Sequence, residues 1–466
     1  MLENAISNLK DGIENTIRRY PIAVAVALLA TLLSWYAIQV ENRSHYPDRR
    51  EYLSSIFLLI ALCSVAMPVV FSAHVIYNTG KRIAAIAIFA ALPLLLWFFS
   101  WRVGYKIDTE YDVLLYFLWS AAGHFLAAIA AFWHADQLNG FWQWNKQLFL
   151  RFLTSGLYSS VLYLGIAGAI LAVRLLFDWK MPDEVFAYLF VTIGVLFQSM
   201  FFLGGLSAPI EDLQHETDYP KGLKIFTQYV LLPLLGVYFV ILYLYMGKII
   251  VQVALPKGSV CFLILGFSVV GILSILLLHP LLDDENEAKW VRVVGKFFYF
   301  LLLPLTVLMF ISIGVRLGDY GVTPNRYIML LLAFWLFATC LYFIFSKKRN
   351  IIVIPASLML ISFFCSFGPW SVMQVSVRSQ TAILKQLFID NKLMKNDTLC
   401  ALSKTQDTSV KDTLLKGTGR RIESILVALE EMGEMGTVKK WIPKTWQKAV
   451  FRDANNFDIT VLQDKL

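Results

Sequence analysis

Charged residues are scarce in this chain. Asp, Glu, Lys and Arg make up 16% of its 466 residues, whereas soluble globular proteins carry about 25%. Hydrophobic residues make up 58% and aromatic residues 15%. This composition excludes an ordinary soluble enzyme and a disordered protein, because both need far more polar sequence. It predicts a polytopic membrane protein.

Cysteine and the common catalytic motifs are also in short supply. The five cysteines include no Cys-x-x-Cys pair and no Cys/His spacing typical of a metal site. The sequence contains no Walker A loop, Rossmann glycine pattern, His-Glu-x-x-His or Gly-x-Ser-x-Gly motif. These absences argue against ATP-driven transport by this chain and against the commonest hydrolase mechanisms. We therefore expect no metal, no cofactor and no catalytic residue, and the balance leans against an enzyme.

Apolar segments follow one another along most of the chain, and a helical span needs about 20 such residues. Eleven segments qualify: 21–40, 52–77, 83–103, 113–133, 155–177, 187–207, 226–247, 260–280, 297–316, 327–346 and 351–372. They are too long for barrel strands, so they must be helices. Segment 136–152, rich in Trp and Phe, is expected to lie at the membrane interface. The predicted fold class is all-α: a polytopic transmembrane helix bundle of about eleven spans with a small C-terminal extramembrane domain.

The net charge of +8 is read as a topology signal, because Lys and Arg concentrate in cytoplasmic loops. Loops on the N-terminal side hold 15 Lys and Arg, and the opposite short loops hold 11. This bias predicts a cytoplasmic N-terminal segment at 1–20, a transmembrane domain at 21–372 and an extracytoplasmic domain at 373–466. An even number of spans would reverse the side of that last domain. The lipid bilayer is the expected partner, and nucleic acid is not.

The segment 373–466, called the tail below, differs sharply in composition from what precedes it. Helical spacing of apolar residues predicts one helix over Ser376–Asn391 and a second over Gly419–Met432. In the second, Ile422, Ile425 and Leu426 share one face with Leu429. We expect a small folded domain beside the membrane.

Polar residues inside the apolar segments are the default functional candidates. His124, Gln198 and Gln228 are the three that we select. For His124 two readings stay open: a hydrogen-bonded packing role beside small residues such as Gly123, or a proton or ligand role. No Asp or Glu lies centrally in any span, which disfavours a proton-coupled carrier.

A loop between the sixth and seventh segments is unusually acidic. Within eight positions it holds Glu211, Asp212, His215, Glu216 and Asp218. Such a group suits binding of a divalent cation or acid–base chemistry. The plainer alternative is a solvated acidic loop. The predicted topology places it on the cytoplasmic side.

Two polar segments flank the last two spans on the opposite side. In the first, Gly321 permits a tight turn and Thr323 and Pro324 suit a helix start. In the second, Gly368 and Pro369 break the last span. Together they predict a polar patch of Tyr320, Thr323, Asn325, Arg326, Tyr327, Trp370, Ser371, Ser376, Arg378, Ser379 and Gln380. A helix exit with interfacial anchoring is the alternative.

These two segments carry a resemblance. The pattern GVTPNRY, a span, a short basic loop and a span ending in SFGPWSVMQVSVRSQ resembles a bacterial membrane protein family, domain of unknown function 4153. RIESILVALEEMG resembles that family's later helical stretch. The likeness is most specific over 317–435. The resemblance implies an inner-membrane protein with many helices and an extracytoplasmic tail. It also implies that longer members of the family continue further than this chain after the stretch that matches residue 435. The family name records no activity.

Three functions remain open. The leading hypothesis is an envelope-associated binding, scaffold or sensor protein that uses the tail and the patch, with an envelope protein or lipid-linked ligand as partner. The second is a transporter or channel for a small solute, which predicts a polar cavity near His124, Gln198 or Gln228. The third is a membrane enzyme for a lipid-linked envelope substrate, which predicts that Arg326 meets an anionic head group.

Overall fold

The fold was analysed in a computed structural model. It describes residues 2–42, 49–105, 107, 109–134, 136–206, 209–252, 259–282, 289–346, 349–400, 419–453 and 456–457. Helices dominate these residues, and the fold is an all-α bundle of a multi-pass membrane protein. Its spans contact the lipid bilayer.

Ten helices of the described residues are long and apolar enough to cross a membrane. Eight are continuous: α2 (Pro21–Asn42), α3 (Arg49–Asn78), α4 (Arg82–Arg102), α5 (Glu110–Ile129), α6 (Leu138–Leu176), α11 (Ser259–Leu282), α12 (Lys289–Tyr320) and α13 (Pro324–Phe345). Two contain a π-helical turn: α7 (Glu184–Val191) with η1 (Thr192–Phe197) and α8 (Gln198–Gly204), and α9 (Lys221–Phe226) with η3 (Thr227–Leu231) and α10 (Leu232–Gln252). Each matches a predicted apolar segment.

The eleventh predicted segment forms a shorter helix than expected. α14 (Val353–Phe364) has 12 residues, or about 18 Å, against a hydrocarbon core of about 30 Å. The chain then turns through Gly368, whose φ is +82°, so the predicted break is present. The predicted span over 351–372 therefore consists of a 12-residue helix followed by this break.

Most of the predicted interfacial segment 136–152 forms the start of α6. α6 is one helix of 39 residues, about 58 Å long, and residues 140–144 near its start are buried. The indole N–H of Trp142 donates to the carbonyl of Leu276, and that of Trp144 donates to the carbonyl of Ala127. Trp142 and Trp144 therefore pack against neighbouring helices, and the interfacial position of the segment stays a prediction.

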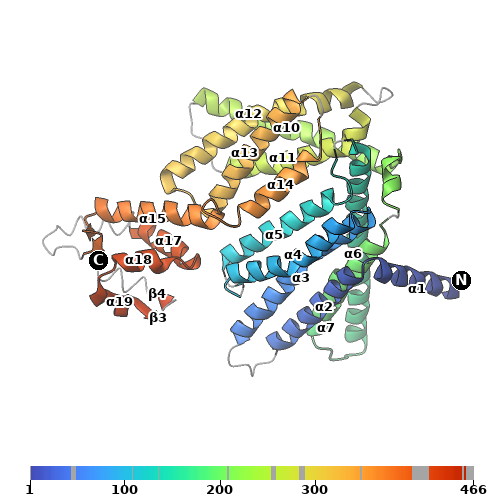
Figure 1. Cartoon of the computed structure of the whole chain (residues 1–466), viewed down its shortest axis with the longest axis horizontal. Coiled ribbons are helices and arrows are strands. Elements are labelled where there is room, and N and C mark those ends of the chain that lie inside the picture. Colours follow the sequence, from blue (N-terminus) through green and yellow to red (C-terminus); the bar gives the residue numbers. More distant parts are fainter. Residues whose placement is uncertain are drawn as a thin grey trace.

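The membrane helices form two lobes (Figure 1). The first lobe consists of α2 to α8, and the second of α9 to α13. α14 packs along α5, and one continuous hydrophobic core extends through both lobes. The amphipathic helix α1 (Leu2–Arg19) precedes the first lobe and contacts α8.

The tail has a hydrophobic core of its own. It contains α15 (Val372–Asp390), α17 (Gly419–Glu431), α18 (Met435–Trp441), α19 (Lys444–Val450) and two short hairpins, β1 (Met394–Lys395) with β2 (Thr398–Leu399) and β3 (Phe451–Asp453) with β4 (Asn456–Phe457). Both predicted helices are present. The predicted apolar face of α17 is buried against Leu384 and Phe388 of α15. The hairpins were not predicted.

Candidate functional site

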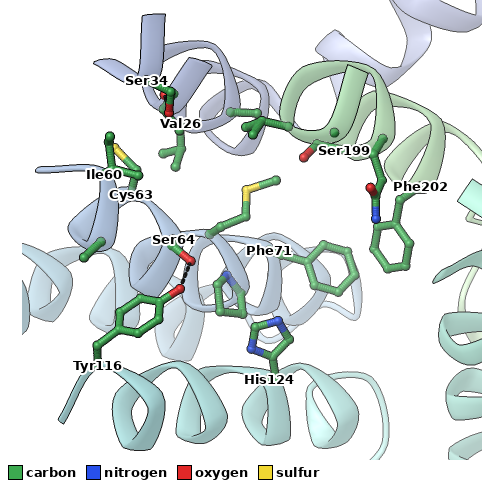
Figure 2. A pocket seen from close by; sticks show the side chains of 18 of the residues that line it. Val26, Ser34, Ile60, Cys63, Ser64, Phe71, Tyr116, His124, Ser199 and Phe202 are labelled. Atoms are coloured by element: carbon green, nitrogen blue, oxygen red, sulfur yellow. Dashed lines mark hydrogen bonds between the residues drawn. The ribbon is translucent and has the colours of Figure 1, made fainter. Parts of the chain in front are cut away.

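A large cavity lies inside the first lobe. Its volume is about 820 Å³, and α2, α3, α5, α6 and the η1–α8 region line it. These helices form a closed ring, because α2 packs on α3 and η1, α3 on α5, α5 on α6, and α6 on η1 and α8. Figure 2 shows side chains from several of these helices pointing into the space. The volume falls within the usual range for ligand pockets, about 300–1,000 Å³.

The cavity is elongated and mostly apolar. Its lining on α3 runs from Phe57 to Phe71 and on α5 from Val113 to Ala127. Fourteen residues of helix rise about 21 Å. Polar groups are a minority of the wall: Ser34, Ser64, Tyr116, His124, Ser155, Gln198 and Ser199. The site therefore suits a long ligand that is largely apolar.

His124 presents its ring to this cavity (Figure 2). Its Nδ1 lies 2.7 Å from the carbonyl oxygen of Ser120, so Nδ1 carries the proton and donates it. In the neutral ring Nε2 is then the hydrogen-bond acceptor. Its neighbour Gly123 makes the close helix contact instead, because an added Cβ would lie 2.8 Å from Cγ of Pro68.

A second polar group joins the two helices beside His124. The hydroxyls of Ser64 on α3 and Tyr116 on α5 are hydrogen bonded at 2.8 Å (Figure 2). Pro68 lies one turn after Ser64 and has no N–H to donate to its carbonyl. The wall of α3 thus carries the Ser64 hydroxyl, which is bonded to Tyr116. It also carries the Ser64 carbonyl, which accepts no helical hydrogen bond from Pro68.

The opposite wall contains the π-helical turn η1. Gly194 and Val195 of this turn line the cavity, followed by Gln198 and Ser199. Such turns occur often at functional sites, because they widen the helix and redirect side chains. Nothing lies within 4 Å of a Cβ built on Gly194, so this wall has room beside the backbone.

An aromatic cluster closes one end of the cavity. The rings of Phe71 and Trp144 stack with centroids 6.0 Å apart, and Phe202 meets Phe71 at 6.0 Å. The ring of Tyr20, which lies between α1 and α2, has its centroid 5.8 Å from that of Phe71. Phe71 and Trp144 are 5% and 0% exposed. The cavity therefore ends at these rings on the side of the membrane where α1 meets α2.

The three predicted intramembrane residues do not all meet. His124 and Gln198 line the same cavity. Gln228 lies in η3 of the second lobe, is 4% exposed and does not line it. Ser64, Tyr116 and Ser199 were missed, because Ser and Tyr in a span carry no distinctive signal.

The acidic loop is held by its backbone rather than by its carboxylates. Asn139 of α6 donates from Nδ2 to the carbonyls of Gln214 and Glu216, both at 2.8 Å. Lys146 donates to the carbonyl of Asp218 at 2.9 Å. The five selected side chains, Glu211, Asp212, His215, Glu216 and Asp218, are exposed. Within the described part of the chain, no group of three His, Cys, Asp or Glu residues is placed to hold a metal ion.

The predicted polar patch is brought together in part, as a joint between the α12–α13 turn and α15. Ser379 Oγ accepts from the N–H of Val322 at 2.9 Å. Nε2 of Gln380 donates to the carbonyls of Tyr320 and Val322 at 3.1 and 2.9 Å. Gly321 adopts a φ of +70°, and a Cβ there would collide with Ile383 of α15. The turn therefore needs glycine for both reasons.

The remaining patch residues take varied positions. The Tyr327 hydroxyl donates to the carbonyl of Trp370, and Ser371 caps α15 by accepting from the N–H of Gln374. Thr323 is the N-cap of α13 with Pro324 after it, as predicted, although its side chain makes no capping bond. Ser376 is fully buried, and Asn325 and Arg378 are exposed.

Arg326 lies over the ring of Tyr320, with Cζ 5.2 Å from the ring centroid. The Cζ of Arg421, on α17, lies 5.9 Å from the centroid of the same ring. Arg421 could not be predicted from the sequence, because nothing in the local pattern of α17 connects it with the α12–α13 turn.

Comparison with known proteins gives a family and a relative. A family model described as Domain of unknown function (DUF4153) matches residues 23–404. The chain is 25% identical over 357 residues to Uncharacterized protein PM1469 of Pasteurella multocida (strain Pm70), a match that covers 75% of this chain and 55% of that protein. The chain thus spans about half the length of this curated relative. No solved structure matches.

Proposed function

This chain belongs to the DUF4153 family, and we propose that it is a membrane-embedded binding protein whose first lobe holds an amphipathic, lipid-like ligand. The cavity carries this proposal. It is long and mostly apolar, yet His124 and Gln198 face into it. Moving a chain of methylene groups from water to such a wall lowers its free energy, and the few polar groups fix its orientation.

The proposed setting is the bacterial inner membrane, with the N-terminus in the cytoplasm and the tail outside. The excess of Lys and Arg on the N-terminal side supports this orientation. The cavity then ends at Phe71 near the cytoplasmic face, and its other end, at Phe57 and Val113, lies toward the outer leaflet. A ligand drawn from the outer leaflet fits this arrangement.

The tail supports a sensor or scaffold role for the same protein. α5 lines the cavity with one face, and its residues Leu115 and Trp119 pack in a core that includes Phe363 and Met373. Met373 belongs to α15, the first helix of the tail. α5 therefore borders the cavity and also packs in a core that includes a residue of the tail.

A matched glycine pair tests the binding proposal. Gly194→Leu fills the cavity wall, whereas Gly168→Leu places the same side chain on the exposed surface of α6, and neither Cβ meets a neighbour within 4 Å. The probe is a phosphatidylglycerol with a diazirine in one acyl chain, reconstituted with the full chain. Peptide mapping should find labelled residues on the cavity faces of α3 and α5. Gly194→Leu should reduce this labelling several-fold, and Gly168→Leu should not. Equal labelling in all three proteins would reject the proposal.

A transport function is the second candidate, and the aromatic end of the cavity favours it. Phe71, Trp144 and Phe202 separate a deep cavity from the other face, as a closed gate would. A purely aqueous channel fits less well, because the wall is mostly apolar. Transport of a lipid-like ligand would require these rings to separate. Vesicles in which Phe71→Ala speeds movement of a fluorescent phosphatidylglycerol between leaflets would support it.

A further inference from the structure

Arginines from two separate helices approach one tyrosine at the joint between the second lobe and the tail. Arg326 of α13 and Arg421 of α17 lie 5.2 and 5.9 Å from the centroid of Tyr320. Arg316, near the end of α12, is close enough for its charge to repel that of Arg326. Arg326 and Arg421 over Tyr320, together with Arg316 near Arg326, are called the arginine cluster below.

The charges of Arg316 and Arg326 are not balanced by any carboxylate whose side chain is described. The Nη1 of Arg326 donates to the carbonyls of Gly321 at 3.1 Å and Tyr320 at 3.5 Å, and neither carbonyl carries a net charge. Ion pairs between described side chains lie elsewhere: Arg18–Glu14, Arg49–Glu41, Arg174–Asp183 and Lys385–Asp397. Two guanidinium ions held together repel each other, and a bound anion removes that repulsion.

The position of Arg326 is fixed before any ligand arrives. The carbonyls that it contacts belong to the turn that Ser379 and Gln380 fasten to α15. The face of Tyr320 supports its guanidinium from one side. A planar, preorganised guanidinium is well suited to two parallel hydrogen bonds with a phosphate group.

The cluster lies where phosphate groups are abundant. α12 ends at Tyr320 and α13 begins at Pro324, so the cluster stands at the edge of the membrane. Trp370, which is 53% exposed, is hydrogen bonded through its carbonyl to Tyr327 one residue after Arg326. Trp and Arg at a helix end are typical of the head-group region.

We propose that the arginine cluster binds the phosphate of an anionic lipid head group, with Arg326 making the direct contact and Arg316 contributing charge. The site lies in the second lobe and does not depend on the cavity of the first. The phosphate of a soluble compound shares the same chemistry, so the test must separate these two sources.

The test uses native mass spectrometry of the full chain in detergent, with added phosphatidylglycerol or phosphatidylcholine. The unmodified protein should retain phosphatidylglycerol preferentially. Arg326→Gln should weaken its binding about tenfold or more, the effect of losing hydrogen bonds to a charged group. Arg326→Lys should lose part of the affinity, because it keeps the charge without the planar fork. Arg174→Gln is the matched control, since Arg174 is already paired with Asp183.

Inorganic phosphate is the second probe, followed by ³¹P line broadening with the same variants. Binding of phosphatidylglycerol but not of phosphate assigns the site to a lipid, whereas Arg326-dependent binding of both assigns it to any phosphate. Arg316→Gln, at an exposed position, gives a second variant if Arg326→Gln fails to fold. The proposal is overturned if neither variant lowers binding below that of Arg174→Gln.

Discussion

The hydroxyl of Tyr327, in the first turn of α13, donates a hydrogen bond to the backbone carbonyl of Trp370. At the other end of α13, the hydroxyl of Tyr342 accepts from the N–H of Asn350 at 3.2 Å. The chain from Asn350 to Trp370 therefore returns from the end of α13 to its start. The tail therefore begins beside the α12–α13 turn, although α14 alone is too short to cross a membrane.

This relationship predicts the side on which Cys400 is labelled. Cys400 is partly exposed, and Cys63, Cys261, Cys340 and Cys365 are buried. An impermeant maleimide added to cells with a permeabilised outer membrane should therefore label Cys400, if the tail is extracytoplasmic as proposed. Labelling is read as a mass shift of the intact protein.

Two introduced cysteines in a Cys400→Ser background control this experiment. Asn325→Cys, beside the α12–α13 turn, should behave like Cys400, and Thr217→Cys in the acidic loop should behave oppositely; both positions are exposed. Labelling of Cys400 and Thr217→Cys from the same side would contradict the path described for the last apolar segment.

Gly123 makes the closest approach between α3 and α5, and it gives a prediction about stability. Gly123→Val would place side-chain atoms against Pro68, where even a Cβ lies 2.8 Å from Cγ. Overpacking of this kind lowers the free energy of unfolding by about 1–3 kcal/mol. Gly168→Val is the control, because its Cβ meets nothing within 4 Å. Thermal unfolding in detergent should show a lower midpoint for Gly123→Val alone.

Gln380 is 3% exposed and serves both carbonyls of the α12–α13 turn, so its loss should loosen the tail. Gln380→Ala leaves the carbonyls of Tyr320 and Val322 without this donor, at a cost of about 1–3 kcal/mol. Limited proteolysis should cleave the joint faster. Gln386→Ala removes only an exposed bond to Asp390 and should leave the rate unchanged. Equal rates in both variants would show that Gln380 does not hold the joint.

The membrane helices could be predicted because their apolar runs reflect the solvent around each one. Ten of eleven segments formed long helices, and the polar residues His124 and Gln198 stood out against apolar neighbours. The cavity itself was beyond prediction. It depends on which helices close the ring, and no local pattern records that α2 packs on η1.

The patch shows the same limit. Ser379 and Gln380 were selected as polar groups near a membrane edge, but their hydrogen bonds reach a turn more than fifty residues earlier. Arg421 approaches Tyr320 only because α17 packs on α15. Residues whose chemistry is unusual for their surroundings could be predicted from the sequence. Residues whose role comes from a distant partner could not.

The acidic loop gives a last prediction, which separates its backbone from its side chains. Asn139→Ala removes a donor to the carbonyls of Gln214 and Glu216, the second of which also accepts from Gln143, and should lower the unfolding free energy by about 0.5–1.5 kcal/mol. Glu216→Gln keeps that carbonyl and changes only an exposed carboxylate, so its effect should stay within about 0.5 kcal/mol. Thermal unfolding with and without a chelator measures both. If the loop instead bound a divalent cation through its carboxylates, Glu216→Gln would be the more damaging change, and the chelator would destabilise the unmodified protein. The carbonyl contacts of Asn139 and Lys146 predict the opposite order, with no effect of the chelator.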